Sequence, residues 1–229
     1  MQIKKIRKFL VFLTSILYLS IFPVSSQGSN NCSPIDIEKA ERYLGGFEHA
    51  AISFTQVGIY RNKSEEVKGI LLIEKPGKFR MNYDSPHPLV IVGGGKFISI
   101  YDYDLDELSR IEASDNIFKF LLYLNLKIED SVKIESCVYE NAKIKLDLVH
   151  KETEQKAQIY FTTNPISLEK MIIPDDGNNV LSGAVAITFK NVREVLSFNK
   201  DFFSIRDSRV YGAPKRYSSE EILKILSLK

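Results

Sequence analysis

The most constraining feature of the chain is a succession of short runs of β-branched, aromatic and aliphatic residues, each ended by turn-forming residues. About eleven such runs follow one another, and most of them alternate apolar and polar residues or are apolar throughout. Most of the connections are too short for the crossover helices that parallel strands require. The pattern therefore predicts a mainly β protein built as an antiparallel meander. The expected strands are 53–60, 66–74, 78–84, 89–92, 97–101, 107–112, 132–139, 143–149, 158–162, 167–173 and 181–189.

A short helix is expected before the first strand. Ser33 is a good N-cap, Pro34 fits the first helical position, and Asp36 places an acid in the first turn. The pair at 45–46, Gly-Gly, ends the helix.

Two further helices are expected later in the chain. Residues 118–124 break the strand pattern and predict a short helix. At the end, Ser218 and Glu221 form a capping box, which predicts a helix over 218–229. We expect the segment 211–229 to be appended to the sheet, either as a packed helix or as a loosely docked extension.

The strands around residue 70 must be covered on more than one face. Residues 70–73 read Ile-Leu-Leu-Ile, which is apolar on both faces of a strand. In the next strand successive side chains alternate between an apolar face and a polar face, and we expect the polar face to be in water. The apolar set is Phe79, Met81 and Tyr83, and the polar set is Lys78, Arg80 and Asn82. Either a filled sandwich or barrel, or a curved open sheet that holds an apolar ligand, satisfies this pattern.

The first 26 residues predict export. Four basic residues precede the uncharged run 9–24, which has the length of a signal-peptide core and is shorter than the roughly 20 residues of a membrane span. We expect cleavage after Ser26, giving a signal peptide over 1–26 and a single domain over 27–229; an uncleaved anchor is the alternative. Removing the four basic residues from the total of 31 leaves 27 against 29 acidic ones. The resulting net charge of −2 gives no reason to expect a nucleic-acid partner.

The two cysteines, Cys32 and Cys137, leave two states open. In an exported chain they can form a disulfide, and they can equally be free thiols. They do not have the spacing of metal ligands or of a redox pair. Lipidation at Cys32 is disfavoured because the polar stretch 28–31 separates it from the apolar run.

No motif predicts catalysis or a cofactor. The histidines are scattered, and the acidic turn 102–107 lacks the glycine and the final glutamate of a calcium loop. The glycines at 93–95 are not followed by the Lys-Ser or Lys-Thr pair of a phosphate loop, because Phe97 follows Lys96, and they predict a hairpin turn. No nucleophile elbow is present. We therefore expect no enzymatic activity, no metal and no cofactor.

A set of short motifs resembles a known family. In order they are Phe54-Thr55-Gln56, the run 69–83 (GILLIEKPGKFRMNY), Pro86, the strand 89–92, Gly95-Lys96, Tyr101-Asp102 and Leu105, with looser likeness at 175–177, 181–189, 191–192 and 202–205. Their order and spacing over residues 47–124 resemble the periplasmic outer-membrane lipoprotein carrier family, LolA. The resemblance implies an unclosed antiparallel half-barrel of about eleven strands, with short helices forming a lid over an apolar cavity.

The same resemblance implies a function. The protein would bind the acyl chains of lipoproteins released by an inner-membrane transporter and deliver them across the periplasm to an outer-membrane acceptor. We expect it to work as a monomer. The alternatives are a periplasmic lipid-binding sensor of the envelope state and a hydrolase of envelope lipid or polysaccharide.

The resemblance also implies site residues. The apolar cavity would be lined by Phe54, Leu71, Ile73, Phe79, Met81, Tyr83, Ile98 and Ile100. Each of these side chains could instead be ordinary core. Lys75 stands where the family usually has an arginine that holds the lid and controls release, and we expect a looser latch because an ammonium lacks the planar donor fork.

Overall fold

The architecture comes from a computed structural model that describes residues 31–60, 63–113, 119–124, 127–175 and 184–227. Residues 1–26, expected to be a signal peptide, lie outside the described residues. No helix among those described is long and apolar enough to cross a membrane.

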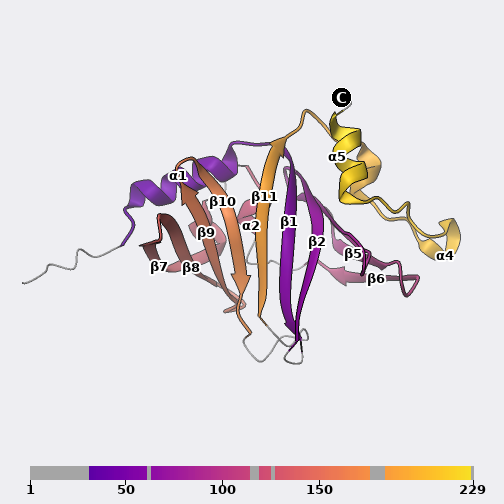
Figure 1. The fold of residues 1–229 in the computed structure, drawn as a ribbon, viewed down its shortest axis with the longest axis horizontal. Helices are drawn as coiled ribbons and strands as arrows, with labels where there is room; N and C mark the ends of the chain where they lie inside the picture. Colours follow the sequence, from indigo (N-terminus) through magenta and orange to yellow (C-terminus); the bar gives the residue numbers. More distant parts are fainter. Residues whose placement is uncertain (1–30, 61–62, 114–118, 125–126, 176–183, 228–229) are drawn as a thin grey trace, which may run out of the picture.

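One antiparallel sheet of eleven strands forms the body of the protein (Figure 1). Its spatial order is β6-β5-β4-β3-β2-β1-β11-β10-β9-β8-β7, so β6 and β7 are the two edges and the sheet does not close into a barrel. The strands are β1 (His49–Tyr60), β2 (Lys63–Glu74), β3 (Lys78–Tyr83), β4 (Leu89–Gly93), β5 (Phe97–Asp102), β6 (Glu107–Glu112), β7 (Val132–Glu140), β8 (Lys143–His150), β9 (Lys156–Thr163), β10 (Ile166–Ile173) and β11 (Val185–Glu194).

The pairing of β1 with β11 joins two meanders into one sheet. β1 pairs with β2 from His49–Glu74 to Tyr60–Lys63, and its other edge pairs with β11 from Ala50–Glu194 to Gly58–Val185. Strand pairing between the two ends of the chain therefore holds the N-terminal and C-terminal halves together. The predicted mainly β, unclosed antiparallel architecture is confirmed.

Several strand ends differ from the sequence prediction. β1 begins at His49, before the expected residue 53, and β11 ends at Glu194, beyond the expected residue 189. Both extensions pair with a neighbouring strand, which supplies hydrogen bonds that no local pattern reveals. Residues 181–183 of the expected last strand and residues 176–177 of the expected turn before it lie outside the described residues.

The helices are short. They are α1 (Pro34–Gly45), α2 (Lys119–Leu122), α3 (Ile128–Ser131), the 3-10 helix η1 (Lys200–Phe203), α4 (Ser208–Tyr211) and α5 (Ser219–Ser227). α1, α2 and α5 fall where the sequence predicts helices, and residues 118 and 228–229 of those predictions lie outside the described residues. α3, η1 and α4 were not predicted because each is a single turn with at most two apolar residues, whereas α2, which is equally short, lies within the apolar run 118–124. In Figure 1, α1 crosses the β7–β10 end of the sheet, and α4 and α5 lie at the other end.

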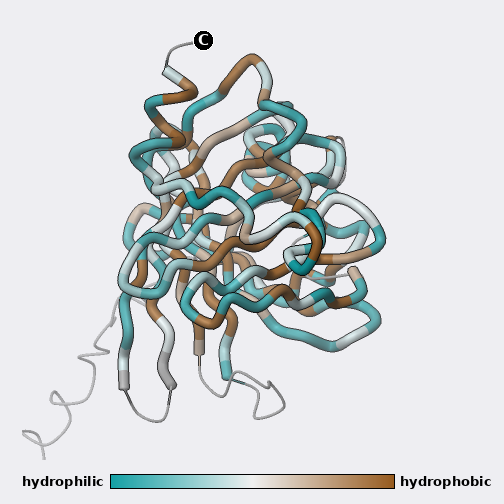
Figure 2. Tube along the Cα trace, turned by 90° about the vertical axis from the view of Figure 1, so that its right-hand side faces the viewer, coloured by the Kyte–Doolittle hydropathy of each residue, from teal (hydrophilic) through white to brown (hydrophobic). Residues whose placement is uncertain are grey.

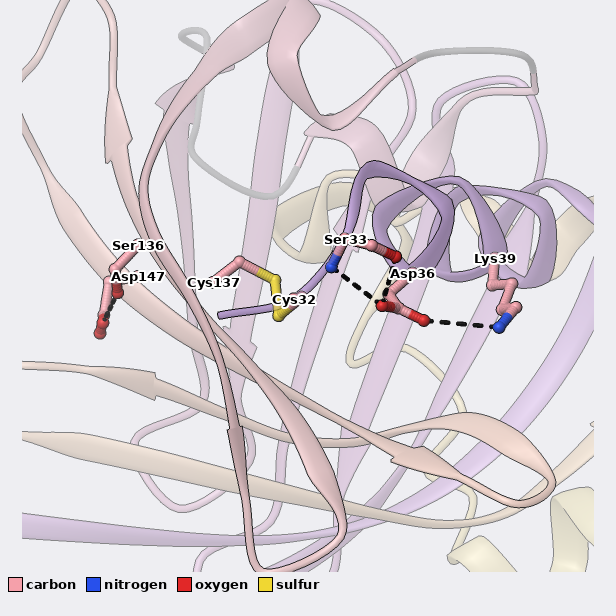
Figure 3. Close-up of a disulfide and its surroundings, with 7 residues drawn as sticks. All are labelled: Cys32, Ser33, Asp36, Lys39, Ser136, Cys137 and Asp147. Carbon is pink, nitrogen blue, oxygen red and sulfur yellow. Dashed lines mark hydrogen bonds and ion pairs between the residues drawn. A yellow bond between two sulfur atoms is a disulfide. The ribbon is translucent and has the colours of Figure 1, made fainter. Parts of the chain in front are cut away.

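A disulfide between Cys32 and Cys137 fixes the start of α1 to strand β7 (Figure 3). The sequence left the pairing of these cysteines open, and the structure shows that they form a disulfide. The Cys32 amide also donates to the Cys137 carbonyl at 3.0 Å. At the helix start, the Asp36 carboxylate accepts from both the amide and the hydroxyl of Ser33, at 3.0 and 2.7 Å. These hydrogen bonds, with the Ser33 hydroxyl the largest cause, lower the pKa of Asp36 to about 2. The predicted cap is therefore confirmed.

The inner face of the sheet carries the larger apolar core. Helices α1, α2 and α3 pack on this face and contribute Leu44, Phe120, Leu121 and Ile128 to the core. The strand residues buried beneath these helices are Ile144, Leu146, Leu148, Ile159 and Phe161. The β7–β10 half of the inner face is therefore filled by the protein's own helices.

The outer face carries a second, smaller core. Ile70 and Leu72 of β2 are buried there against residues of the C-terminal segment, which are Phe198, Phe202, Ile222 and Leu226. The apolar run of β2 is thus covered on both faces, as its sequence predicts. Figure 2 shows apolar (brown) segments in the strands and in the C-terminal helix, and hydrophilic (teal) segments in many of the connections.

The prediction that the polar face of β3 is exposed to solvent is wrong. Arg80 and Asn82 are only 3% and 1% exposed, because η1 and the segment before α5 cover them. The Arg80 Nη1 donates to the Phe202 carbonyl at 3.0 Å, and the Asn82 Nδ2 donates to the Tyr217 carbonyl at 3.2 Å. Polar side chains on this face hold the C-terminal segment to the sheet.

Ile222 tests whether α5 is an integral part of the fold. Its side chain is completely buried in the core formed with β2, so we expect Ile222→Ala to lower the free energy of unfolding by about 3 kcal/mol. Lys224→Ala, on the exposed side of the same helix, should change it by less than about 0.5 kcal/mol. Urea denaturation measures both values. Equal, small effects would show that the helix is only loosely docked.

Candidate functional site

The strand register places the predicted lipid-binding residues in rows across the inner face. Leu71 of β2 pairs with Met81 of β3, which pairs with Ile91 of β4, which in turn pairs with Ile100 of β5. A second row joins Ile73, Phe79 and Gly93. Residues that are distant in the sequence therefore form one continuous apolar surface.

Burial of the predicted residues decreases from β1 and β2 toward the β6 edge. Phe54, Leu71 and Ile73 are buried and belong to the inner core. The other five predicted residues are only partly buried: Phe79, Met81, Tyr83, Ile98 and Ile100. The first three of the predicted set are thus core, and the last five offer apolar surface beside the helices.

Two apolar residues of this surface were missed. Ile91 lies between Met81 and Ile100 in the first row and is partly buried. Ile111 of β6 pairs with Ile98 and is 51% exposed. The signal for Ile91 was available, since simple alternation along β4 assigns it to one face with Leu89. Ile111 stands in a strand of mostly polar residues, so only the register places it here.

Glycines make room for two aromatic rings on this face. A Cβ at Gly69 would lie 2.5 Å from the Phe54 ring, and a Cβ at Gly93 would overlap the Phe79 ring. The Phe54 ring also meets the Tyr83 ring edge to face, at 5.2 Å between centroids. Both glycines therefore serve the packing of aromatic side chains on neighbouring strands.

The Tyr83 hydroxyl is the polar end of this aromatic pair. It lies 2.9 Å from Gln56 Oε1, and burial raises the pKa of Tyr83 to about 12. The phenol is therefore a neutral donor to Gln56 at neutral pH.

Lys75 lies where the sheet meets α1. Its side chain is 2% exposed, and its Nζ donates to the Leu44 carbonyl near the end of α1. The same Nζ lies 4.1 Å from the centroid of the Phe47 ring. None of the ion pairs formed by the described residues includes Lys75, and burial lowers its pKa to about 8. A carbonyl dipole and an aromatic face hold this ammonium.

The turn that carries Lys75 also contacts α2. The Gly77 amide donates to the Leu122 carbonyl at 2.6 Å, and the Lys75 amide donates to the Glu48 carbonyl at 2.9 Å. Gly77 has a φ of +79°, a conformation that favours glycine. The β2–β3 turn is therefore the place where both α1 and α2, hereafter the lid helices, are fastened to the sheet.

No metal centre is evident in the described ranges, where no group of three or more His, Cys, Asp or Glu residues could hold an ion. His150 is buried, and its Nδ1 accepts from the amides of Glu152 and Thr153 at 3.3 and 3.1 Å. This histidine stabilises the turn after β8.

Comparison with known proteins identifies the family. Residues 46–206 match the family model described as outer membrane lipoprotein carrier protein LolA. The uncharacterized protein RP864 of Rickettsia prowazekii is 36% identical over 217 residues, which cover 95% of this chain and 96% of that protein. The outer-membrane lipoprotein carrier protein of Chromobacterium violaceum is 36% identical over 74 residues, covering 32% of this chain and 36% of that protein.

Solved structures also align with the chain, at low identity. The LolA superfamily protein from Nitrosomonas europaea aligns with a TM-score of 0.43 at 9% identity, over 76% of this chain and 98% of that chain. A putative outer membrane lipoprotein-sorting protein domain from Vibrio parahaemolyticus aligns with a TM-score of 0.44 at 11% identity, over 78% of this chain and 98% of that one.

The chain belongs to the LolA family of outer-membrane lipoprotein carrier proteins. This confirms the resemblance seen in the motifs of residues 47–124. The family is one of carriers and not of enzymes.

The lowered pKa of Lys75 predicts a pH dependence of stability. Below about pH 8 the ammonium is charged in the folded and unfolded states, so desolvation of the charge offsets part of the stabilisation that its contacts supply. Between about pH 8 and 10.5 the folded protein releases a proton that the unfolded chain keeps, so the free energy of unfolding rises with pH.

Urea denaturation of the native protein and of Lys75→Met, from about pH 7 to about pH 9.5, measures this effect. The difference between the two should shift in favour of the native protein above pH 8, where its ammonium loses charge. A difference that does not change with pH would contradict the buried position of Lys75.

Proposed function

We propose that the mature protein is a periplasmic carrier of acylated lipoproteins. It binds the acyl chains of lipoproteins released from the inner membrane by a transporter and delivers them to an outer-membrane acceptor. Family membership and the names of the carrier relatives support this role. The observation that carries the proposal is the partly exposed apolar surface on the inner face of β3–β6, next to the lid helices.

The two halves of the inner face differ in what covers them. Over β8–β10 the side chains of α1 and α3 complete the core, and the strand residues there are buried. Over β3–β6 the apolar side chains remain partly exposed, up to 51% at Ile111. An acyl chain laid along this second half would bury surface that the protein itself leaves in contact with water.

The energy of such a contact suits a carrier. Burying one methylene contributes about 0.8 kcal/mol, so shielding roughly ten of them contributes about 8 kcal/mol, near micromolar affinity. Burying every methylene of a triacylated anchor would make release extremely slow. Partial shielding on an open face allows a tighter acceptor to take the cargo.

Lys75 would couple the lid helices to the state of this face. Its contact with the Leu44 carbonyl stabilises the lid helices on the sheet when no cargo is bound. Cargo that moves the lid helices must break this contact, so the contact lowers the apparent affinity for cargo and favours release. The latch is thus part of the proposed transfer step.

The direct test is transfer of a labelled lipoprotein from membranes that contain the energised releasing transporter. The mature protein should form a soluble one-to-one complex with the lipoprotein, detected by native mass spectrometry. The complex should require the acyl chains. Binding of free phospholipid without any lipoprotein would overturn the carrier role.

A charge on the apolar surface should block uptake. We expect Ile100→Glu to reduce the amount of soluble lipoprotein complex at least about tenfold, because a carboxylate in contact with acyl chains must be desolvated. Ile100 is only partly buried, so the sheet should still fold. The matched control is Phe97→Glu on the same strand, whose side chain is 47% exposed on the opposite face. Equal uptake by the two variants would show that the inner face of β3–β6 is not the acyl-binding surface.

Removal of the latch should affect release more than capture. Lys75→Leu deletes the donor to the Leu44 carbonyl, so the state with the lid helices open gains population and holds cargo more tightly. We expect normal or increased capture with slower transfer to the acceptor, and restoration by Lys75→Arg. Transfer kinetics of the preformed complex measure this, and a normal rate in Lys75→Leu would exclude the latch role.

A further inference from the structure

A pocket of about 510 Å³ lies on the outer face, away from the apolar inner surface. η1, the loop after it, α4 and the segment leading to α5 surround it. Its charged lining residues are Arg80, Arg206, Lys215 and Asp201. The carrier role assigns nothing to this pocket.

Arg80 contributes a buried cation whose hydrogen bonds are incomplete. Nε donates to Asn82 Oδ1 at 2.6 Å, and Nη1 donates to the Phe202 carbonyl at 3.0 Å. Nη2 is buried and has no hydrogen-bond partner among the described residues. A buried donor without an acceptor costs stability, and a charged one costs more. Arg80 therefore has a free donor and an unneutralised charge next to the pocket.

Each of the three cations of the pocket lies over an aromatic ring. The Arg80 guanidinium lies 5.8 Å from the Phe202 centroid and 5.9 Å from the Tyr217 centroid. Lys215 Nζ lies 4.7 Å from the Tyr217 centroid, and the Arg206 guanidinium lies 5.4 Å from the Tyr211 centroid. None of the ion pairs between described residues includes any of these three. A cation–π contact does not occupy N–H donors, so Nη2 of Arg80 and the donors of Arg206 and Lys215 remain for a ligand.

We propose that this pocket binds a phosphate monoester, with Arg80, Arg206 and Lys215 as its cationic groups. Three cations against the one carboxylate of Asp201 leave an excess charge of about two, which matches the charge of about −1.5 to −2 on such a group. Its oxygens can accept from several donors at once, and guanidinium groups match this geometry well. Because Nη2 is buried, the proposal requires Tyr217, the more exposed of the two rings on Arg80, to move aside when the ligand binds.

The test is a titration of the mature protein with glycerol 3-phosphate at constant ionic strength. Calorimetry measures the affinity, and the NMR signal of the Arg80 Nε–H group reports whether the ligand reaches the guanidinium. We expect saturable binding and a shift of this signal. Absence of saturable binding up to about 10 mM would overturn the proposal.

Variants locate the binding. Arg206→Gln and Lys215→Gln change exposed rim residues, so both should fold and each should weaken binding about tenfold. Lys133→Gln, an exposed lysine on β7, is the matched control and should bind as the native protein does. Arg80→Gln should abolish binding, and if it fails to fold the rim variants still decide. Equal binding by the rim variants and the native protein would overturn the pocket assignment.

Two sources of the phosphate are distinguished by vesicles. Phosphatidic acid vesicles that displace glycerol 3-phosphate, while phosphatidylcholine vesicles do not, would identify a lipid headgroup as the source. Glycerol 3-phosphate binding without competition from vesicles would identify a soluble phosphate ester. Ile100→Glu should leave either result unchanged, which separates this site from the proposed acyl-binding surface.

Discussion

The structure depends on β2, an interior strand of the sheet that is apolar on both faces. Ile70 and Leu72 face outward and Leu71 and Ile73 face inward, so neither face of β2 can remain in water. The C-terminal segment covers the outer face, and the inner face receives the lid helices. On the inner face the cover is complete over β8–β10 and extends to the buried residues of β1 and β2, whereas over β3–β6 it is only partial.

This uneven cover connects the fold to the proposed function. Filling the β7–β10 half gives the sheet a rigid core, and the disulfide from Cys32 to Cys137 fastens α1 to that same half. The β3–β6 half keeps apolar side chains partly exposed. Lys75 stands at the boundary, where a buried ammonium depends on one carbonyl and one ring. A contact with so few partners can be broken at modest cost when cargo arrives.

The sequence predicted the strands well because alternation and turn residues are local signals. It could not decide the state of Cys32 and Cys137, since their spacing carries no information about their distance in the fold. It misplaced Arg80 in water because the segment that covers this residue lies more than a hundred positions later and shows no local signature. A local sequence pattern cannot show that a distant segment of the chain covers a side chain, and this limits the prediction of exposure from sequence.

The candidate site shows the same limit. All eight predicted lining residues share the inner face or its core, yet alternation alone did not separate the buried Leu71 from the partly exposed Ile100. Ile111 was found only through its pairing with Ile98. Register and coverage, which are tertiary properties, decide which apolar residues remain open to a ligand.

The central claim is that acyl chains bind the inner face of β3–β6. Methyl NMR during titration with a triacylated lipopeptide tests it most directly. The account predicts shifts at Met81, Ile91, Ile98 and Ile100, with Ile70, Leu72 and Ile222 on the outer face unchanged. Shifts confined to the outer-face methyl groups, or no shifts at all, would contradict it.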